Sequence, residues 1–249
     1  AKGTYPSDDD LHCFFSNITN MSTKATAYLL GPNNKQYQIW GVVEHHMDKA
    51  AYIAAKKNIS KAGYFCTGNL ALPTEAGGTS GGELIATRKD MTLAKGIRKP
   101  NIDNSHCTWL RCQGHTLLIG ILYLRTREKL SSEWNSKILD TLGRFLRAIQ
   151  TPFIIYGDWQ NHYEDLLRSG WPQFLQGTII VASHTVSTCT AGEGGILDYV
   201  LASDSIAGHL TLELILGVPW GPHRGLGLRY SKGRAMRQPI RTIRRLIEI

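Results

Sequence analysis

The sequence predicts a single α/β domain, and three features of the chain support this. Short apolar runs of strand length alternate with a few longer amphipathic stretches, and no interior repeat or linker separates them. Apolar residues make up 42% of the 249 residues and charged residues 19%, which suffices for a buried core. The longest apolar run, 116–124, is about half the roughly 20 residues of a membrane helix, so we expect no membrane partner.

The N-terminal half is predicted to alternate short strands with one helix. Residues 46–61 are rich in Ala and Lys and place their apolar side chains at helical spacing. A glycine-rich turn follows at 77–82, and the segment 89–105 is predicted to be a loop. Residues 107–112 and 117–123 are predicted to form a hairpin. The other strands predicted in this half are 13–18, 38–43, 63–67 and 83–87.

The C-terminal half contains the strongest helical pattern, over residues 132–150. Its apolar stripe consists of Trp134, Ile138, Leu142, Phe145, Leu146 and Ile149. The helix is expected to end before Pro152, because a residue that precedes proline disfavours helical backbone angles. The continuous apolar run 153–156 is typical of a fully buried strand. A short helix is predicted at 161–169, and further strands at 178–182, 197–202, 210–216 and 226–230.

Positive charge is concentrated at the C-terminal end of the chain. Residues 224–249 contain eight Lys or Arg and one Glu, and so carry seven of the eight net positive charges. This asymmetry has two interpretations, a polyanionic partner such as nucleic acid, or a solvated tail or linker. The residues that we assign to nucleic-acid binding are Arg224, Arg229, Lys232, Arg234, Arg237 and Arg241.

Five cysteines lie at irregular spacing, which argues against a disulfide framework. Cys107 and Cys112, with His106 and His115 beside them, have a spacing that a zinc site can also show. We favour two buried thiols, because Cys112 ends one apolar strand and the next strand begins almost at once.

Isolated polar residues stand where several apolar runs end. They are Asn17, Glu44, Tyr123, Asp158, Asp198 and His223. A carboxylate at the mouth of a buried strand is costly unless a cation or an ionised partner compensates it. Oxygen ligands of this kind suit Mg²⁺, which takes one or two protein carboxylates together with substrate phosphate oxygens. A simple role as a strand-end cap is the alternative for each residue alone, so the prediction depends on the whole set.

Seven short motifs, in this order and spacing, carry a resemblance to a known family. They are SNIT at 16–19, WGVVEH at 40–45, GGTSGG at 77–82, LY at 122–123, IIYGDWQ at 154–160, LDYV at 197–200 and PH at 222–223. The chain thereby resembles the endonuclease/exonuclease/phosphatase (DNase I-like) superfamily, and most of all the apurinic endonucleases and the endonuclease domains of non-LTR retrotransposons.

The resemblance implies a four-layer α/β sandwich, in which two packed mixed β-sheets are flanked by helices. It covers roughly residues 11–230, so we expect this range to form the domain. Residues 1–10 would then be a flexible N-terminus, and residues 231–249 a basic C-terminal tail. The active site is expected at one edge of the sandwich, where strand ends and loops meet.

The resemblance also assigns roles to the polar residues, position by position. Glu44 and Asp198 match metal-binding acids of the family, and Asn17 matches the asparagine beside the metal site. Asp158 matches the aspartate that orients or deprotonates the attacking water, with Gln160 in the same motif. Phosphodiester cleavage places extra negative charge on the phosphate, which hydrogen-bond donors and a cation stabilise.

Tyr123 and His223 match the family residues that face the scissile phosphate. Two departures from the family pattern concern this side of the site. Gln160 stands where Asn is usual, and Pro222 stands where an Asp usually precedes the histidine. We therefore expect His223 to lack a carboxylate that orients its imidazole and raises its pKa, unless Asp204 or Asp48 replaces it.

The function implied by the resemblance is a Mg²⁺- or Mn²⁺-dependent phosphodiesterase. The leading form is a retrotransposon-type DNA endonuclease that nicks through a metal-activated water. The alternatives are a phosphatase or RNA nuclease on the same fold, or a binding or assembly module that has lost catalysis. The expected partners are nucleic acid, in first place DNA, and further domains of a longer polyprotein. The expected location is nuclear or otherwise intracellular.

Overall fold

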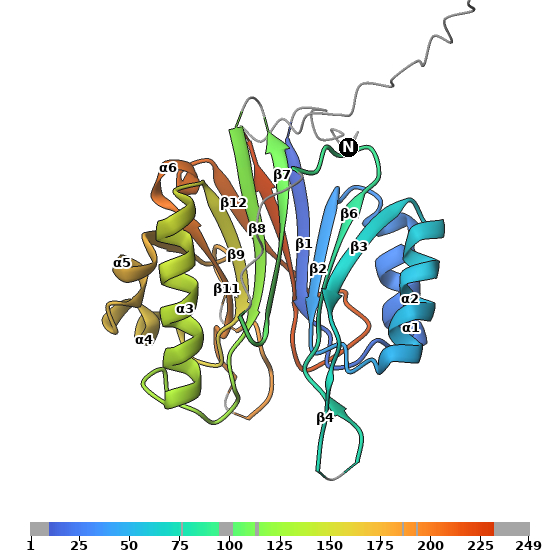
Figure 1. Ribbon diagram of the computed structural model, residues 1–249, viewed down its shortest axis with the longest axis horizontal. Coiled ribbons are helices and arrows are strands. Elements are labelled where there is room, and N and C mark those ends of the chain that lie inside the picture. The colour runs from blue at the N-terminus through green and yellow to red at the C-terminus, as the bar shows by residue number, and fades with distance from the viewer. Residues whose placement is uncertain are drawn as a thin grey trace, which may run out of the picture.

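Two mixed β-sheets pack face to face and are flanked by helices on their outer sides (Figure 1). The structure is a computed structural model. It describes residues 10–75, 77–94, 102–112, 115–185, 187–192 and 194–231. The predicted four-layer α/β sandwich is confirmed. The predicted N-terminus and basic tail lie almost entirely outside the described residues, and the division at 10 and 231 stays a prediction.

The first sheet has six strands in the order β12-β13-β1-β2-β6-β3. Strands β1 and β2 are parallel, and the other neighbours are antiparallel. The strands are β1 (Leu11–Asn17), β2 (Ile39–Val43), β3 (Tyr64–Asn69), β6 (Glu83–Arg88), β12 (Leu210–Ile215) and β13 (Gly225–Tyr230).

The second sheet has five strands in the order β10-β11-β9-β8-β7. Strands β8 and β9 are parallel, and the other neighbours are antiparallel. The strands are β7 (Ser105–Cys112), β8 (His115–Tyr123), β9 (Phe153–Asp158), β10 (Gly177–Ile180) and β11 (Asp198–Ser203).

Helices cover the outer face of each sheet (Figure 1). On the six-stranded sheet they are α1 (Thr23–Leu30) and α2 (Lys49–Lys61). On the five-stranded sheet they are α3 (Glu133–Ile149), α4 (Tyr163–Arg168) and α5 (Trp171–Leu175). The short elements are η1 (Pro32–Asn34), α6 (Asp204–Ala207) and a hairpin of β4 (Leu72–Pro73) and β5 (Thr79–Ser80). None of the described helices is long and apolar enough to cross a membrane.

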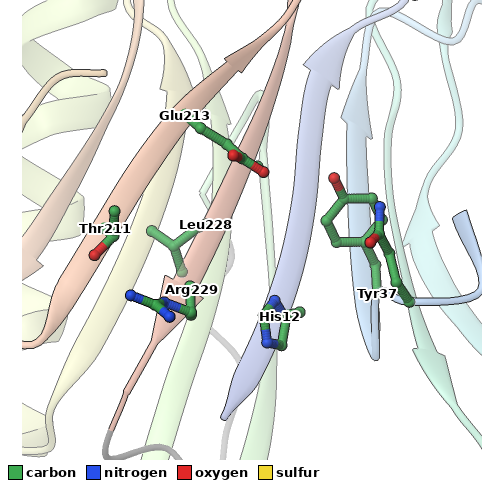
Figure 2. A pocket seen from close by; sticks show the side chains of 8 residues that line it. His12, Tyr37, Thr211, Glu213, Leu228 and Arg229 are labelled. Atoms are coloured by element: carbon green, nitrogen blue, oxygen red, sulfur yellow. The ribbon is translucent and has the colours of Figure 1, made fainter. Parts of the chain in front are cut away.

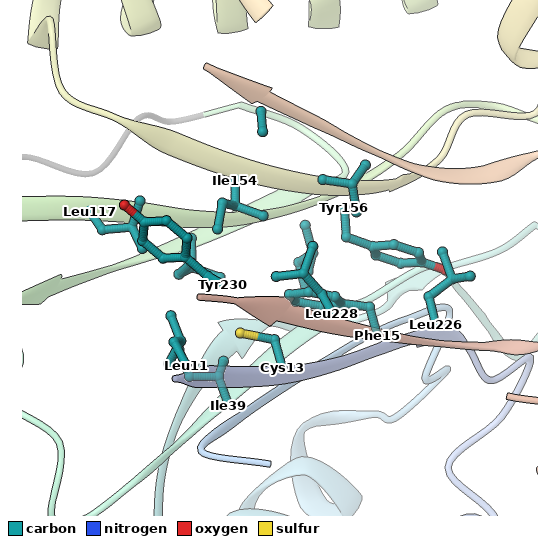
Figure 3. Close-up of a cluster of buried hydrophobic side chains, with 14 of the residues drawn as sticks. Leu11, Cys13, Phe15, Ile39, Leu117, Ile154, Tyr156, Leu226, Leu228 and Tyr230 are labelled. Atoms are coloured by element: carbon teal, nitrogen blue, oxygen red, sulfur yellow. The ribbon is translucent and has the colours of Figure 1, made fainter. Parts of the chain in front are cut away.

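The core between the sheets consists of inward-facing residues from both of them (Figure 3). The ring of Phe15 on β1 stacks on Tyr156 of β9, with ring centroids 5.3 Å apart and an interplanar angle of 7°. Both rings are fully buried, and the aliphatic side chains of β13 pack beside them. This contact fixes the two sheets against each other close to the edge where β1 and β9 end.

Several local predictions need correction. Helix α1 was not anticipated from the sequence, because only Ala25 and Leu29 of its eight residues are buried and no longer stripe marks it. Helix α2 begins at Lys49 rather than at 46, because His46 has a left-handed φ of 54° and Asp48 caps the helix. Trp134 was predicted in the buried stripe of α3, but its surface is 41% exposed.

The two cysteines of strand β7 do not form a zinc site. Cys107 and Cys112 are five positions apart in one strand, so their side chains point to opposite faces of the sheet. Cys107 packs under the helices, whereas Cys112 lies between the sheets. All five cysteines are buried and none of them forms a disulfide bond, as expected for core thiols.

Candidate active site

The strand register brings the predicted polar residues to one edge of the sandwich. In the five-stranded sheet, Asp158 at the end of β9 stands opposite Tyr123 at the end of β8 and Asp198 at the start of β11. In the six-stranded sheet, Asn17 at the end of β1 pairs with Val43, which directly precedes Glu44. Because the two sheets are packed face to face, these ends meet across the interface.

Asp158 is the centre of the cluster, and its carboxylate is completely buried. Its Oδ2 accepts hydrogen bonds of 2.8 Å from Nδ2 of Asn17 and 2.8 Å from Nε2 of Gln160. Nε2 of His223 lies 3.6 Å from the same oxygen. The longer side chain of Gln160 therefore reaches the aspartate of its own motif.

The amide of Asn17 joins the two sides of the site. Its Nδ2 also donates a 2.7 Å hydrogen bond to Oε2 of Glu44, so one amide group links the carboxylates of Glu44 and Asp158. Its Oδ1 accepts a 2.8 Å hydrogen bond from the backbone N–H of Thr19, which fixes the orientation of the amide. Glu44 keeps 17% of its side chain exposed and is the more accessible acid of the two.

The glycine-rich turn supports the backbone that follows Glu44. The N–H groups of His45 and His46 donate to the carbonyls of Gly82 and Gly81, at 3.3 and 3.0 Å. The buried ring of His45 accepts from Met47 N–H and contacts the carbonyl of Asn69. Burial lowers the pKa of His45 to about 4, so the ring is neutral at physiological pH.

Gly82→Ala is expected to destabilise the fold. Gly82 has a φ of +92°, and a Cβ there would overlap the His45 ring. Gly77 in the same turn has a φ of +78° but open space around it, so Gly77→Ala carries only the backbone strain. We expect Gly82→Ala to lower the free energy of unfolding by about 2 kcal/mol more than Gly77→Ala, measured by urea denaturation. An equal loss of unfolding free energy in the two variants would show that the His45 ring does not clash with a Cβ at position 82.

His223 does have an orienting carboxylate, contrary to the expectation from Pro222. Its Nδ1 forms a 2.9 Å hydrogen bond with Oδ2 of Asp198, which lies on strand β11. The other oxygen of Asp198 accepts a 2.9 Å hydrogen bond from the hydroxyl of Tyr156. The two aspartates proposed as replacements lie elsewhere: Asp48 caps α2, and Asp204 accepts a hydrogen bond from Thr178.

Burial and charge shift the pKa values of the two groups that face each other. Burial alone lowers the pKa of His223, but the hydrogen bond and charge of Asp198, with the charges of Asp158 and Glu44, raise it to about 9. Burial raises the pKa of Asp158 above the usual aspartate value, and the charge of Asp198 raises it further. A protonated histidine therefore stands beside a carboxylate of raised basicity.

Tyr123 lies at the mouth of the site and borders an open cleft of about 470 Å³. Its hydroxyl is 2.8 Å from Oγ1 of Thr126, and burial raises its pKa. The loop after Tyr123 is held by the buried amide of Asn135, which accepts from the N–H of Arg125 and donates to the carbonyl of Glu128. The tyrosine therefore sits on a fixed loop, next to space that a substrate can enter.

The oxygen donors of this cluster fit a hard divalent cation such as Mg²⁺. Within the described part of the chain, ligand atoms of Asp158, Asp198 and His223 lie within 4.8 Å of one another. Both oxygens of Asp198 already accept hydrogen bonds, from Tyr156 and His223, so Glu44 is the more available acid. The assignment of Glu44 and Asp198 as metal ligands stays a prediction.

Two of the basic residues assigned to nucleic acid are described by the structure, and these two do not lie together. Arg224 follows His223 directly, but Arg229 pairs with His12 at the far end of β1 from Asn17. There it lines a separate cavity of about 320 Å³ with Thr211 and Glu213 (Figure 2). The remaining four lie outside the described residues: Lys232, Arg234, Arg237 and Arg241.

Three residues that support the site were not anticipated from the sequence. The hydroxyl of Thr188 accepts hydrogen bonds of 2.9 and 3.0 Å from the N–H groups of Asp198 and Leu197. Tyr156, which reads as part of an apolar strand, binds Asp198. Cys189 lies 3.7 Å from Nε2 of His223. Thr188 and Cys189 are in an irregular segment, so no periodic pattern marks either of them.

Comparison with solved structures gives the same fold. The endonuclease domain of TRAS1, a telomere-specific non-LTR retrotransposon, matches with a TM-score of 0.66 and 12% identity, over 90% of this chain and 99% of that one. The AP endonuclease LMAP from Leishmania major matches with a TM-score of 0.68 and 12% identity, over 93% and 89%. The 3′ phosphatase NExo from Neisseria, bound to a product DNA hairpin, matches with a TM-score of 0.63 and 14% identity, over 88% of this chain and 98% of that one.

These matches define the class of the fold. The chain has the DNase I-like fold of the endonuclease/exonuclease/phosphatase superfamily, as the motifs predicted. No family sequence model and no curated protein sequence matches it. The similarity is therefore one of structure.

Proposed function

We propose that the protein is a divalent-metal-dependent endonuclease that nicks DNA, of the type found in non-LTR retrotransposons. The observation that carries the proposal is the amide of Asn17, which links the carboxylates of Glu44 and Asp158, with His223 3.6 Å from Asp158. This arrangement places an accessible acid, a buried base and a cationic donor around one point. A metal-binding acid, a general base and a cationic donor can together catalyse the hydrolysis of a phosphodiester.

Asp158 is the group that accepts the proton of the attacking water. Asn17 and Gln160 both donate to its Oδ2, which leaves Oδ1 with one longer hydrogen bond of 3.3 Å, from the N–H of Gln160. We therefore assign Oδ1 to the water. The raised pKa of Asp158 suits a base that works near neutral pH.

His223 and Tyr123 are the donors to the phosphate oxygens. Asp198 holds Nδ1 of His223, so the protonated ring presents Nε2–H toward the substrate. Glu44 is the residue that would hold Mg²⁺ or Mn²⁺, with Asn17 fixing its carboxylate. Such an ion supplies positive charge to the phosphate and to the leaving oxygen.

The choice of DNA as substrate rests on the structural neighbours and on charge. TRAS1 is a telomere-specific non-LTR retrotransposon, and NExo is bound to a product DNA hairpin. The cluster of Lys and Arg at 224–249 suits a polyanion better than a small phosphoester. On this proposal the protein works in the nucleus or elsewhere inside the cell, beside further domains of a polyprotein.

The hydrogen-bonded site also supports an active enzyme over the module that has lost catalysis. The two residues that departed from the family pattern are compensated, since Gln160 reaches Asp158 and Asp198 holds His223. Burying a carboxylate such as Asp158 beside a protonated imidazole such as His223 is costly. In a module without catalysis, no function would offset this cost.

Nicking of supercoiled plasmid tests the proposal. We expect nicking with Mg²⁺ or Mn²⁺ and none with EDTA, and we expect Glu44→Ala to lower the rate about 10²–10³-fold. Glu164→Ala is the matched control, because Glu164 pairs with Arg168 on the exposed side of α4. Equal rates in both variants would show that Glu44 does not take part in catalysis and would exclude the proposed active site. Faster turnover of RNA or of a soluble phosphoester than of plasmid would exclude DNA as the preferred substrate.

A further inference from the structure

An arginine without an acidic partner lies beside the active site. Arg125 follows Tyr123 by two residues and lines the same open cleft of about 470 Å³. None of the ion pairs among the described residues involves its guanidinium, whereas Arg88, Arg144 and Arg168 each pair with an acid. The reaction proposed for the site gives this charge no role, so its position needs a separate explanation.

The guanidinium of Arg125 stacks on the indole ring of Trp134. The central carbon of the guanidinium lies 3.6 Å from the ring centroid. Trp134 is the second residue of α3 and is exposed rather than part of the buried stripe. A ring that covers one face of a guanidinium leaves the N–H groups at its edge free to bind an anion. Trp134 therefore holds a cation whose donors remain available.

The backbone of Arg125 is fixed by the buried side chain of Asn135. The N–H of Arg125 donates a 2.9 Å hydrogen bond to Oδ1 of Asn135. Nδ2 of Asn135 donates to the carbonyls of Glu128 and Lys129, at 3.2 and 3.3 Å, so the loop wraps around one amide group. A residue whose backbone and side chain are both held loses little conformational freedom when it binds a ligand, which strengthens the binding.

The charge and reach of this loop suit the phosphates of a nucleic-acid strand. Three cations, Arg125, Arg127 and Lys129, and one acid, Glu128, give the loop a net charge of +2. A free guanidinium edge matches the geometry of phosphate oxygens. Consecutive Cα atoms are about 3.8 Å apart, so the Cα of Arg125 lies within about 7.6 Å of that of Tyr123. One DNA strand has a phosphate about every 3.4 Å along the helix axis, so this span corresponds to roughly one or two nucleotides.

We propose that Arg125 binds a DNA phosphate roughly one or two nucleotides from the scissile phosphate, and that Trp134 positions Arg125 for this contact. The inference rests on the proposed function, because that function places the scissile phosphate at Tyr123. The cleft supplies the space for the strand, and the hairpin β4–β5 lines it from another side with Leu72 and Pro73. Arg125 holds the strand in place and takes no part in the chemical step.

DNA binding measured in EDTA tests the contact without any nicking. The affinity of the full chain for a fluorescent DNA duplex is measured by anisotropy at several salt concentrations. We expect Arg125→Gln to bind about tenfold more weakly and to reduce the slope of log affinity against log salt concentration by about 0.9, because one phosphate contact is lost. Arg144→Gln is the matched control, since it removes the same charge from an arginine that pairs with Asp140 on α3. Equal affinities and slopes in the two variants would overturn the contact.

Trp134→Ala tests the positioning role in the same assay. We expect it to weaken binding about two- to fivefold and to keep the wild-type salt slope, because the charge of Arg125 remains. In the double variant with Arg125→Gln it should add no further loss, since Trp134 acts through Arg125. A full additional loss in the double variant would overturn the positioning role. Glu128→Gln removes the acid that lines the cleft and should tighten binding, whereas weaker binding would contradict a phosphate in this cleft.

Plasmid nicking by the same proteins separates this inference from the proposed function. If Arg125→Gln loses one phosphate contact but the wild type never nicks, the proposed function is refuted and the phosphate contact stands. If the wild type nicks and Arg125→Gln both binds and nicks as the wild type does, the contact is overturned and the proposed function stands. A wild type that binds no DNA even at low salt would overturn both.

Discussion

Asp158→Asn is expected to lower the nicking rate by about 10³-fold while leaving the fold intact. The asparagine keeps an oxygen for the hydrogen bonds from Asn17 and Gln160, but it cannot take a proton from water. The loss should appear in kcat, with DNA binding nearly unchanged, because the change removes a base and not a contact surface. Plasmid nicking under saturating enzyme measures the rate, and a gel-shift assay measures binding.

The same variant is expected to be at least as stable as the wild type at pH 8. Burial raises the pKa of Asp158, so the folded protein disfavours the charged carboxylate. Because the pKa of Asp158 is higher in the folded than in the unfolded protein, the wild type loses stability as pH rises between these two pKa values. The neutral amide of asparagine removes this loss. Thermal melts at pH 5 and pH 8 should show it as a smaller pH dependence of Tm.

Asp204→Asn is the matched control for both measurements. Asp204 is an exposed aspartate whose carboxylate accepts a hydrogen bond from Thr178, away from the site. Its variant should nick at the wild-type rate. A wild-type rate in Asp158→Asn would remove the proposed base, and a strongly reduced Tm would indicate that Asp158 serves the fold instead.

The fold was predictable because its strands are short, strongly apolar runs in a characteristic order. Strand β9 is an example, since its continuous apolar residues end in an aspartate that cannot stay buried without partners. Helix α1 escaped notice because only two of its eight residues face the core. The hairpin β4–β5 escaped notice because two-residue strands leave no alternation to detect.

The sequence pointed to the polar residues that meet at this edge of the sandwich, but not to the hydrogen bonds between them. The missing acid before His223 suggested an unsupported imidazole, yet its carboxylate comes from Asp198, 25 residues earlier in the chain. Arg229 was assigned together with Arg224 because both are basic, but it lies at the other end of strand β13, and its role stays a prediction. The local sequence indicates which polar side chains stand at strand ends, whereas the strand register determines which of these side chains contact one another.

The pairing of Asp198 with His223 predicts a distinctive pH profile. The proposed reaction needs a charged Asp158 and a protonated His223, so kcat/KM should rise and then fall with pH. The pKa of Asp158 is raised, so the acid limb should lie above the usual aspartate value of about 4. The pKa of His223 is raised to about 9, so activity should be lost as pH rises through that value.

Asp198→Asn is expected to move the alkaline limb toward neutral pH. Without the carboxylate, His223 loses the hydrogen bond and the charge of Asp198 that raise its pKa, so the ring loses its proton at a lower pH. At pH 7.5 we expect kcat/KM to drop about 10²-fold or more. If Asp198→Asn only damaged the fold, the rate would fall at every pH and the alkaline limb of the kcat/KM profile would stay at the same pH.

Tyr156→Phe separates the charge of Asp198 from its position. The tyrosine hydroxyl donates to Oδ1 of Asp198, whereas Oδ2 holds His223. Its removal leaves the charge beside the ring, so the alkaline limb should stay near pH 9 while the rate falls only several-fold. Titration of the imidazole of His223 by NMR reads the same pKa directly, without turnover. If Asp198→Asn left that pKa unchanged, the carboxylate would not be the source of the charge on the histidine, and the assignment of His223 as the protonated donor would fail.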